Sequence, residues 1–548
     1  MGEFGICCRA ESMIVNPLSQ RPRLFLTLII GCLVIFMLPY LHAVPAWDGG
    51  WYTACLLNAA EAQFHLKNFN CVGHTSFAYM LLLAIGQYID YGNLFLMQGI
   101  NLLLWCCACI FFYKLSGEIY KKEINPENFC LLTGILAFAP AITGNLLQLN
   151  LDFGVLVFFI PTLYFLIKRS FIALTLSGTL MVFTKETGAA LYLITIFWGV
   201  TFFELRNLSQ IRIKKNLLNF TLLVFPLIIY AARTLYRYLR HPGLNLFYTE
   251  DGYQFEERSF LEMAFDFNFW QPTFKAYLID IFALQFNWIL TAAALAGLFY
   301  CSAKKQGGFD SLKTKRFLFV IFLFLSVIYL VTRHRPFNHL RYIIVALPLF
   351  YLFTYGLITA AFKESCKRFL LWCVLLLTIF SNIRTIDPLS KFLFGTIPLG
   401  KQELLNMSAY FFVPNSVHSK FNRDEIVYNL EYTKLHEISE MVFQDIKLHP
   451  RLTFMGSQDS RFFWPGLVDE KNLRRTGKRQ GVFKPHYFDY VEEFADVVEK
   501  PITLYYLEFP TMISDNQDQK LKRWYTYSHT TSYSIDGYEM KVKVYKKN

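Results

Sequence analysis

The sequence predicts an α-helical polytopic membrane protein that ends in a soluble α/β domain, and three observations support this fold class. Of the 548 residues, 54% are hydrophobic and only 17% are charged, whereas soluble chains carry about 25% charged residues. The mean hydropathy is positive, at +0.32. The apolar residues also gather in runs of about 17 to 23 residues, the length that crosses a bilayer as a helix.

The composition excludes several other classes of protein. The apolar content excludes disorder, and 29 Gly and 20 Pro exclude a collagen-like chain. The net charge of +12 does not indicate nucleic acid as a partner, because Lys and Arg cluster in short loops between apolar runs. The region after Asp387 has no cysteine, so it holds no disulfide framework. The stretch Met1 to Ser12 is interpreted as a leader or added segment, with Met13 as an alternative start.

The apolar runs predict about eleven membrane crossings. They are placed at Leu24 to Leu41, Leu94 to Leu115, Phe129 to Leu147, Leu151 to Ile167, Phe171 to Phe183, Ala189 to Phe203, Leu217 to Leu239, Ala276 to Tyr300, Phe317 to Val331, Tyr342 to Phe362 and Phe369 to Ile383. One further run, Phe77 to Ile89, is too short for a crossing and predicts an interfacial or re-entrant segment.

The basic loops decide the topology. With Phe77 to Ile89 uncounted and Arg21 and Arg23 inside, all the basic loops fall on the cytoplasmic side, as the positive-inside rule requires. These loops are Lys114 to Lys122, Lys168 and Arg169, Arg206 to Lys215, Lys304 to Arg316, and Lys363 to Arg368. We therefore expect a cytoplasmic leader at 1–23 and a membrane domain at 24–386 with its first outer loop at 42–93. An outer soluble domain follows at 387–548.

Four short charged segments then meet at the outer face, where ionisable groups at the membrane edge mark a functional cavity by default. The first is Trp47 to Tyr52, in which Asp48 precedes two glycines and is flanked by Trp47 and Trp51. This pattern favours a general base for a hydroxyl acceptor, with Trp51 and Tyr52 against the substrate. The alternative is a turn residue in an aromatic belt.

Lys185 and Glu186 interrupt an otherwise apolar stretch from Phe171 to Val200. Neighbours on a helix point to different sides, so each charge needs its own partner. Lys185 suits a phosphate, and Glu186 is placed against the substrate. The alternative for both is a hydrated turn between helices.

The segment Arg333 to Tyr342 holds three Arg and two His facing outward. Guanidinium groups bind phosphate in a bidentate manner, so Arg333, Arg335, His339 and Arg341 are candidates for an anion site. The alternatives are contact with lipid headgroups and salt bridges to the soluble domain. Asp152, at the outer start of its span, is either a site residue or a helix N-cap.

The order of these features resembles the GT-C superfamily of polyprenyl-phosphate-sugar glycosyltransferases, most of all its aminoarabinose transferase and protein O-mannosyltransferase branch. Asp48 matches an acidic residue of the family's first outer loop. His74 to Tyr79 is similar to a His-Pro-Pro-Leu-Tyr-Tyr segment, although both prolines are missing here. Asp152 matches a later outer acid, Phe183 to Lys185 resembles Leu-Thr-Lys, and Arg341 to Pro348 resembles an Arg-Tyr segment that precedes a late span.

The resemblance implies a GT-C-like membrane fold with juxtamembrane helices on the outer surface. It also implies an inverting transfer of a hexosyl or pentosyl group to a hydroxyl of an envelope glycolipid, polysaccharide or protein. Asp48 would be the base, and Asp152 would hold the acceptor or orient the site. The donor phosphate would be bound by Lys185, Arg335, Arg341, Arg333 and His339. The substrate contacts would be Trp51, Tyr52, His74, Glu186 and Tyr342. We expect no cofactor and no metal, since no ligand motif is clustered; the alternative is a divalent metal that bridges carboxylates and phosphate, as in some GT-C enzymes.

Two alternative functions remain at this stage. A transporter or flippase of lipid-linked sugars is one, although the spans show no internal repeat. An envelope polysaccharide polymerase or ligase is the other. The location favoured is a bacterial inner membrane with a periplasmic site, and an ER membrane with a lumenal site is the alternative.

The region after Asp387 is expected to be a small α/β domain that covers the site or binds the acceptor. Alternating residues predict strands at Leu452 to Met455, Ile502 to Phe509 and Tyr538 to Tyr545. Helices are predicted at Glu431 to Ile446 and His486 to Val498.

Overall fold

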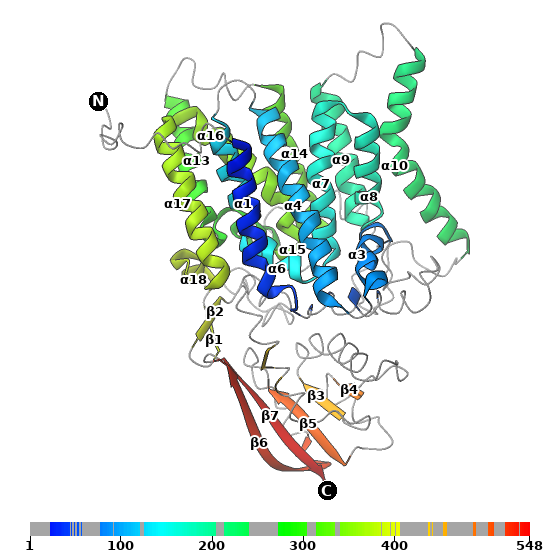
Figure 1. Cartoon of the computed structure of the whole chain (residues 1–548), viewed down its shortest axis with the longest axis vertical. Coiled ribbons are helices and arrows are strands. Elements are labelled where there is room, and N and C mark those ends of the chain that lie inside the picture. The colour runs from blue at the N-terminus through cyan, green and yellow to red at the C-terminus, as the bar shows by residue number, and fades with distance from the viewer. Residues whose placement is uncertain are drawn as a thin grey trace.

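The structure is a computed structural model of the whole chain, in which a bundle of long helices stands next to a small sheet (Figure 1). It describes most of the bundle and the strands of the C-terminal region. The described residues are 22–43, 45, 49, 52–53, 56, 77–90, 93–120, 125–203, 213–240, 272–303, 314–334, 340–384, 386–394, 396–399, 402–405, 437–438, 441, 453–456, 486–488, 502–508, 521–535 and 538–548.

Within these residues, nine helical segments are long and apolar enough to cross a membrane. They are formed by α1 (Pro22–Met37) with η1 (Leu38–Tyr40), α4 (Leu94–Ile119), α7 (Leu151–Lys168), α9 (Glu186–Phe203), α10 (Ile213–Arg240), η4 (Leu284–Phe286) with α13 (Asn287–Ala303), α14 (Lys315–His334), α15 (Leu340–Ile343) with η5 (Ile344–Ala346) and α16 (Leu347–Ala361), and α17 (Glu364–Ile383). The chain is therefore an integral membrane protein, and the predicted fold class is confirmed.

Three of the eleven predicted crossings differ in detail. The run from Phe129 is a broken pair, α5 (Pro126–Ala137) and α6 (Pro140–Leu147), bent by 52°. Pro140 explains the break, because proline cannot donate to the preceding turn. The run from Phe171 forms α8 (Phe171–Val182), which at 12 residues is short for a crossing. The run from Ala276 is two helices, α12 (Pro272–Phe282) and α13, joined through η4.

The short helix α3 (Phe77–Ile89) lies at one end of the bundle, as its length predicts (Figure 1). The end of α1 and the start of α4 lie at the same end of the bundle, because the Gln98 side chain in α4 donates 3.4 Å to the Ala43 carbonyl just after η1. Gln98 also donates 2.6 Å to the Leu147 carbonyl at the end of α6. We call this end of the bundle the site end.

The opposite end collects the other helix termini and their charges, and we call it the basic end. Glu118 at the end of α4 pairs with Lys168 of α7 and, at 3.8 Å, with Arg316 of α14. Glu127 of α5 lies 3.4 Å from Arg368 of α17. Charged residues between the apolar runs of the sequence thus lie at the two ends of the bundle.

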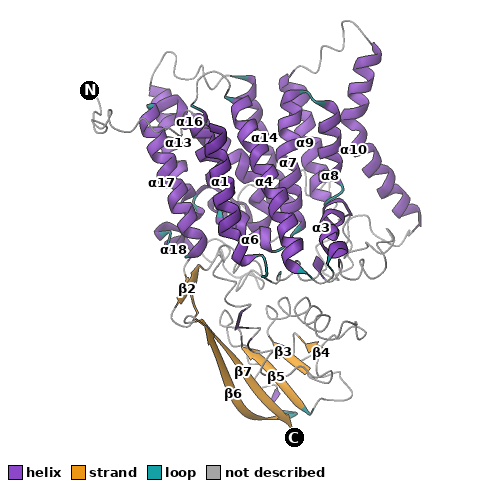
Figure 2. Cartoon of the chain, viewed as in Figure 1, coloured by secondary structure: helices purple, strands orange, loops and turns teal. Residues whose placement is uncertain are grey.

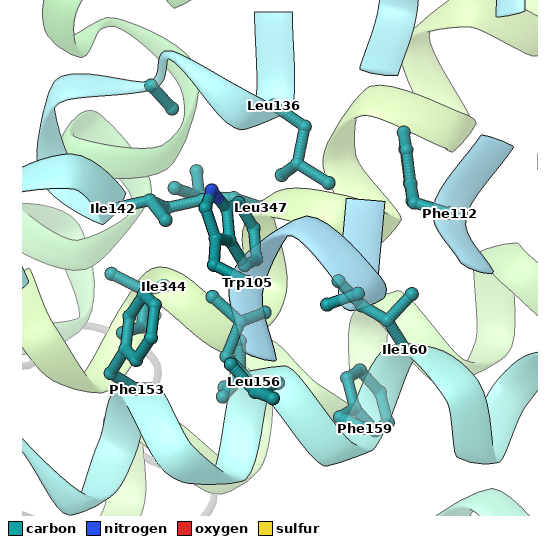
Figure 3. Packing of buried hydrophobic residues seen from close by; sticks show 14 of the residues in the cluster. Trp105, Phe112, Leu136, Ile142, Phe153, Leu156, Phe159, Ile160, Ile344 and Leu347 are labelled. Atoms are coloured by element: carbon teal, nitrogen blue, oxygen red, sulfur yellow. The ribbon is translucent and has the colours of Figure 1, made fainter. Parts of the chain in front are cut away.

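The core joins α4, α5, α6, α7 and α16 through large apolar side chains (Figure 3). Trp105 of α4 is its centre: its ring centroid lies 5.6 Å from that of Phe153, and its indole nitrogen donates 3.3 Å to the Ala137 carbonyl. That bond satisfies a carbonyl freed by the α5 to α6 break. The broken helix is therefore held rigidly beside α7.

The C-terminal region contains two sheets (Figure 2). After α18 (Pro388–Phe394), strands β1 (Thr396–Leu399) and β2 (Gln402–Leu405) form an antiparallel pair. A five-stranded mixed sheet has the order β4-β3-β5-β7-β6. Its strands are β3 (Thr453–Gly456), β4 (His486–Phe488), β5 (Thr503–Glu508), β6 (Tyr525–Ile535) and β7 (Tyr538–Lys547).

Three strands of this sheet, β3, β5 and β7, match the predicted ones. In β7, Val542 and Val544 are buried and Lys541 is exposed, as the alternation requires. The helix predicted from His486 is wrong at its start, where β4 pairs in parallel with β3. Most of the helix predicted at Glu431 to Ile446 lies outside the described residues.

Candidate functional site

Asp152 is placed by a tight turn between α6 and α7. Leu149 in this turn is buried and has a φ of 52°, which reverses the chain within three residues. The residue at the N-cap of α7 is Asn150, so the alternative that Asp152 is the N-cap is wrong. Asp152 instead lies in the first turn of α7, where the helix dipole favours a carboxylate. It is only 5% exposed.

Lys185 is placed by a second tight turn, between α8 and α9. The Gly188 amide donates 2.9 Å to the Lys185 carbonyl, and the Thr184 amide donates 3.2 Å to the Met181 carbonyl. A Cβ at Gly188 would lie 2.2 Å from that same Met181 oxygen, so only glycine fits this turn. The turn holds Lys185 inward, with 4% of the residue exposed.

The two turns bring Asp152 and Lys185 together, 33 positions apart in the chain. The Lys185 ammonium donates 2.8 Å to Oδ1 and 2.7 Å to Oδ2 of Asp152. Lys185, which the sequence left in need of a partner, therefore pairs with a carboxylate in the first turn of α7. Such a buried pair is held by both Coulomb attraction and hydrogen bonds.

Arg341 brings a second cation to the same carboxylate. Its Nε lies 3.8 Å from Oδ2 of Asp152, and its Nη2 donates 3.1 Å to the hydroxyl of Tyr342. The Tyr342 ring has the Arg341 guanidinium carbon 5.1 Å from its centroid and the Lys185 nitrogen 5.0 Å from it. The aromatic ring is thus contacted by both cations.

These four residues, Asp152, Lys185, Arg341 and Tyr342, form what we call the cation cluster. Two full positive charges share one carboxylate, and the side chains of Asp152, Lys185 and Arg341 are only 8%, 5% and 12% exposed. Burying charges at a membrane edge costs several kcal/mol unless they are paired, so a cluster of this kind is retained for a function by default. With two cations beside one carboxylate, the cluster is suited to bind an anion.

Hydrogen bonds between α3, α4 and α6 form a scaffold next to the cluster. The Tyr79 hydroxyl donates 2.7 Å to the Asn101 side chain, which donates 2.6 Å to the Leu146 carbonyl. A Cβ at Gly154, half a turn after Asp152, would lie 2.6 Å from the Tyr79 ring. Asn101 and Gly154 were not predicted from the sequence as parts of the site. The signal that could have found them is the polar pair Gln98 and Asn101, three residues apart in an apolar helix.

The segment that contains Gly49 and Thr53 reaches the turn that precedes Asp152. A Cβ at Gly49 would lie 1.9 Å from the Gln148 carbonyl oxygen and 2.9 Å from Pro45. The Thr53 hydroxyl donates 2.8 Å to the Gly49 carbonyl, and Tyr52 is 5% exposed. The residue that follows Asp48 in the chain therefore packs against the turn that starts α7.

The other predicted site residues lie in or beyond the described part of the chain. Glu186 is the first residue of α9 and is partly exposed. Arg333 belongs to α14, and its side chain lies outside the described part. Five predicted site residues lie outside the described residues altogether: Asp48, Trp51, His74, Arg335 and His339. Over the part of the chain that the structure describes, no three His, Cys, Asp or Glu side chains are grouped as metal ligands.

Comparisons with known proteins give a structural match alone. No protein-family model matches the chain, and no curated protein matches its sequence. The fold is similar to ArnT from Cupriavidus metallidurans bound to undecaprenyl phosphate, with a TM-score of 0.50 and 12% identity over 95% of this chain and 97% of that one.

The apo structure of the same ArnT gives a TM-score of 0.49, with 11% identity over 94% of this chain and 97% of that one. At these identities the match to the undecaprenyl phosphate complex establishes the fold. The predicted resemblance to the aminoarabinose transferase branch is thereby confirmed at the level of fold.

Proposed function

We propose that this chain is a membrane glycosyltransferase that moves a sugar from a polyprenyl-phosphate donor to a hydroxyl of an envelope acceptor. The observation that carries the proposal is the cation cluster. It brings two cations, Lys185 and Arg341, to one carboxylate, buried at the site end of a bundle of membrane helices. The fold match is to a protein whose complex holds undecaprenyl phosphate, a lipid with an anionic head. A lipid phosphate is therefore the anion that best fits this cluster.

The chemistry requires a single displacement. The acceptor oxygen attacks the anomeric carbon, the bond from that carbon to the phosphate oxygen breaks, and the electron pair leaves on the lipid phosphate. Lys185 and Arg341 would stabilise the charge that develops on this leaving group. Because the phosphate leaves as an anion, it needs no protonation, and one carboxylate is sufficient as the base. Arg333, Arg335 and His339 are proposed as further contacts of the phosphate.

Asp48 is the proposed base that takes the proton from the acceptor hydroxyl. Support comes from its neighbour Gly49, which packs against Gln148, four residues before Asp152. Asp152 is proposed to hold Lys185 and Arg341 in position. Tyr52, Trp51, His74 and Glu186 are proposed as substrate contacts around this centre.

The site end is proposed to face the outer side of the membrane, which is the periplasm if the membrane is a bacterial inner membrane. The support is the basic end, where Lys168, Arg316 and Arg368 gather, since positive loops stay in the cytoplasm. The C-terminal sheet would then stand over the site and contact the acceptor. Residues 387–548 are proposed as this outer domain, whose first residues, Asp387 and Ser390, are bound to the helix bundle.

The test compares wild type with Asp48→Asn in membranes supplied with radiolabelled polyprenyl-phosphate sugars. Asp90→Asn is the matched control, because Asp90 is an exposed carboxylate near the same end that accepts 2.8 Å from Asn93. We expect wild type and Asp90→Asn to label the acceptor and Asp48→Asn to lose about 10²–10⁴-fold in rate.

Binding of the donor should survive in Asp48→Asn, because the cation cluster is intact. If no sugar is transferred but labelled lipid moves between leaflets, the glycosyltransferase proposal fails and the transporter alternative replaces it. Polymerisation of lipid-linked glycan without a separate acceptor would instead favour the polymerase or ligase.

A further inference from the structure

The corner between α12 and α13 has an unusual backbone. Gln285 and Phe286 have φ values of 51° and 68°, so two consecutive residues with side chains adopt the left-handed conformation. Neither is glycine, and this conformation costs free energy at each position. Phe286 is buried, so solvent does not supply its hydrogen bonds. Something in the fold must hold this corner.

The holding group is Asp387, which follows α17 and precedes α18. Its carboxylate accepts from the Phe286 amide at 3.0 Å and from the Trp288 indole nitrogen at 3.1 Å. It also accepts from the Leu389 amide at 3.1 Å and from the Ser390 hydroxyl. The Ser390 hydroxyl in turn accepts from the Gln285 amide at 2.9 Å. Both residues of the strained corner are thus tied to Asp387, one of them directly and one through Ser390.

Asp387 is 2% exposed, and across the described residues it has these four donors and no salt bridge. A buried carboxylate that relies on hydrogen bonds alone is costly. An apolar side chain at this position would leave the Phe286 amide and the Trp288 indole without an acceptor, so the four donors hold the carboxylate in one place. The acid therefore indicates that the corner needs one fixed geometry.

The corner fixes α12, and α12 packs against α15, the short helix that carries Arg341 and Tyr342. The end of α12 is further secured by Asn287, which donates 3.0 Å to the Ile281 carbonyl, and by Thr291, which donates 2.7 Å to the Phe282 carbonyl. A continuous path of contacts therefore runs from Asp387 through the corner and α12 to the cation cluster.

We propose that Asp387 is a positioning residue, which fixes the α12 to α13 corner so that α12 holds Arg341 in place for the lipid phosphate. The inference rests on the proposed function for the identity of the phosphate. Asp387 itself lies outside the cluster and touches no reacting group. Its effect passes through the backbone of Gln285 and Phe286 and through α12.

The first experiment measures the corner without any assay of function. Hydrogen exchange of full-length protein in nanodiscs should be at least tenfold faster around 283–289 in Asp387→Asn than in wild type. The amide NH₂ of asparagine cannot accept from the donors that the second carboxylate oxygen served. Ser390→Ala should give a smaller increase, and Asp90→Asn none. Unchanged exchange in Asp387→Asn would overturn the proposal.

The second experiment measures binding of undecaprenyl phosphate to the same samples. Asp387→Asn should weaken binding about tenfold, while acceptor KM in the transfer assay stays unchanged. In the double variant with Arg341→Lys, the two losses should be less than additive, because both act through Arg341. Additive losses, or faster exchange with wild-type binding, would show a corner that serves the fold alone and would overturn the positioning role.

The two proposals fail in different ways. If wild type binds undecaprenyl phosphate, loses binding on Asp387→Asn and transfers no sugar, the positioning role stands and the transferase proposal fails. If wild type does not bind undecaprenyl phosphate, the positioning role fails with it, whatever the exchange at the corner.

Discussion

The two ends of the helix bundle carry the same set of charges in different surroundings. At the site end, Asp152 pairs with Lys185 and Arg341. At the basic end, Glu118 pairs with Lys168 and Arg316. The side chain of Lys185 is 5% exposed and that of Lys168 is 41% exposed.

This difference shows how burial separates a functional cluster from a surface one. The pairs of Glu118 are partly screened by water, because Lys168 is 41% and Arg316 is 30% exposed although Glu118 itself is only 13% exposed, so we expect them to contribute less than the pairs of Asp152. The cation cluster is desolvated, is bordered by the Tyr342 ring and is held by two turns, one with Leu149 at a φ of 52° and one with no space for a Cβ at Gly188. An acid with one Lys and one Arg partner can therefore belong to a buried site or to a more exposed pair. Matched substitutions at the two ends can measure how much each cluster contributes to stability and activity.

The largest difference is expected when the shared carboxylate is removed. Asp152→Ala leaves two buried cations without their acid, and such a loss costs about 3–5 kcal/mol. Thermal unfolding of purified protein in detergent should show a clear fall in Tm, together with loss of transfer. Glu118→Ala, the matched change at the basic end, should lower Tm less, because Lys168 and Arg316 are more exposed and remain hydrated when their carboxylate is removed. Equal falls in Tm for both variants would contradict the distinction between the ends.

A smaller but still large effect is expected from a single methyl group. Gly49→Ala places a Cβ 1.9 Å from the Gln148 carbonyl, so the first outer loop must move away from the start of α7. A displacement of about 1 Å in catalytic geometry can cost about 10²-fold in rate. The matched change is Gly117→Ala at the basic end, where the nearest atom is a Phe129 ring carbon at 3.9 Å. Transfer rates should fall in the first variant and stay unchanged in the second.

The smallest effect is expected from exchanging one cation for another. Arg341→Lys keeps the charge but loses the hydrogen bond to the Tyr342 hydroxyl and the planar contact with its ring. Donor KM should rise about tenfold, since a desolvated cation–π contact is worth about 1–2 kcal/mol. Arg316→Lys should leave donor KM as it is in wild type. A wild-type donor KM in Arg341→Lys would remove Arg341 from the phosphate site.

Much of this site was predictable because hydropathy and charge constrain membrane proteins strongly. Runs of apolar residues place the helices, and the basic loops place Asp152, Lys185 and Arg341 at one end. Charges inside an apolar stretch need partners, so the sequence indicated that Lys185 has one, although it did not indicate which. The identity of that partner depends on two turns whose geometry comes from Leu149 and Gly188.

The parts that could not be predicted depend on long-range contacts. The corner at Gln285 and Phe286 has no glycine to signal a left-handed backbone, and it exists because Asp387, about 100 residues later, accepts its amides. The sequence around His486 was predicted to be helical from neighbouring residues alone. The residues from His486 instead form a strand, because they pair with β3, more than 30 residues earlier in the chain. The 52° bend between α5 and α6 was signalled by Pro140, but its direction was not.

The most direct test of the central claim uses one substitution at both ends of the bundle. Transfer of a radiolabelled sugar from a polyprenyl-phosphate donor is measured in proteoliposomes for wild type, Lys185→Met and Lys168→Met. Size exclusion in detergent checks that all three proteins are folded. If the cation cluster binds the donor phosphate, Lys185→Met loses about 10²–10³-fold in rate and Lys168→Met keeps the wild-type rate. Equal rates in the two folded variants would contradict the claim.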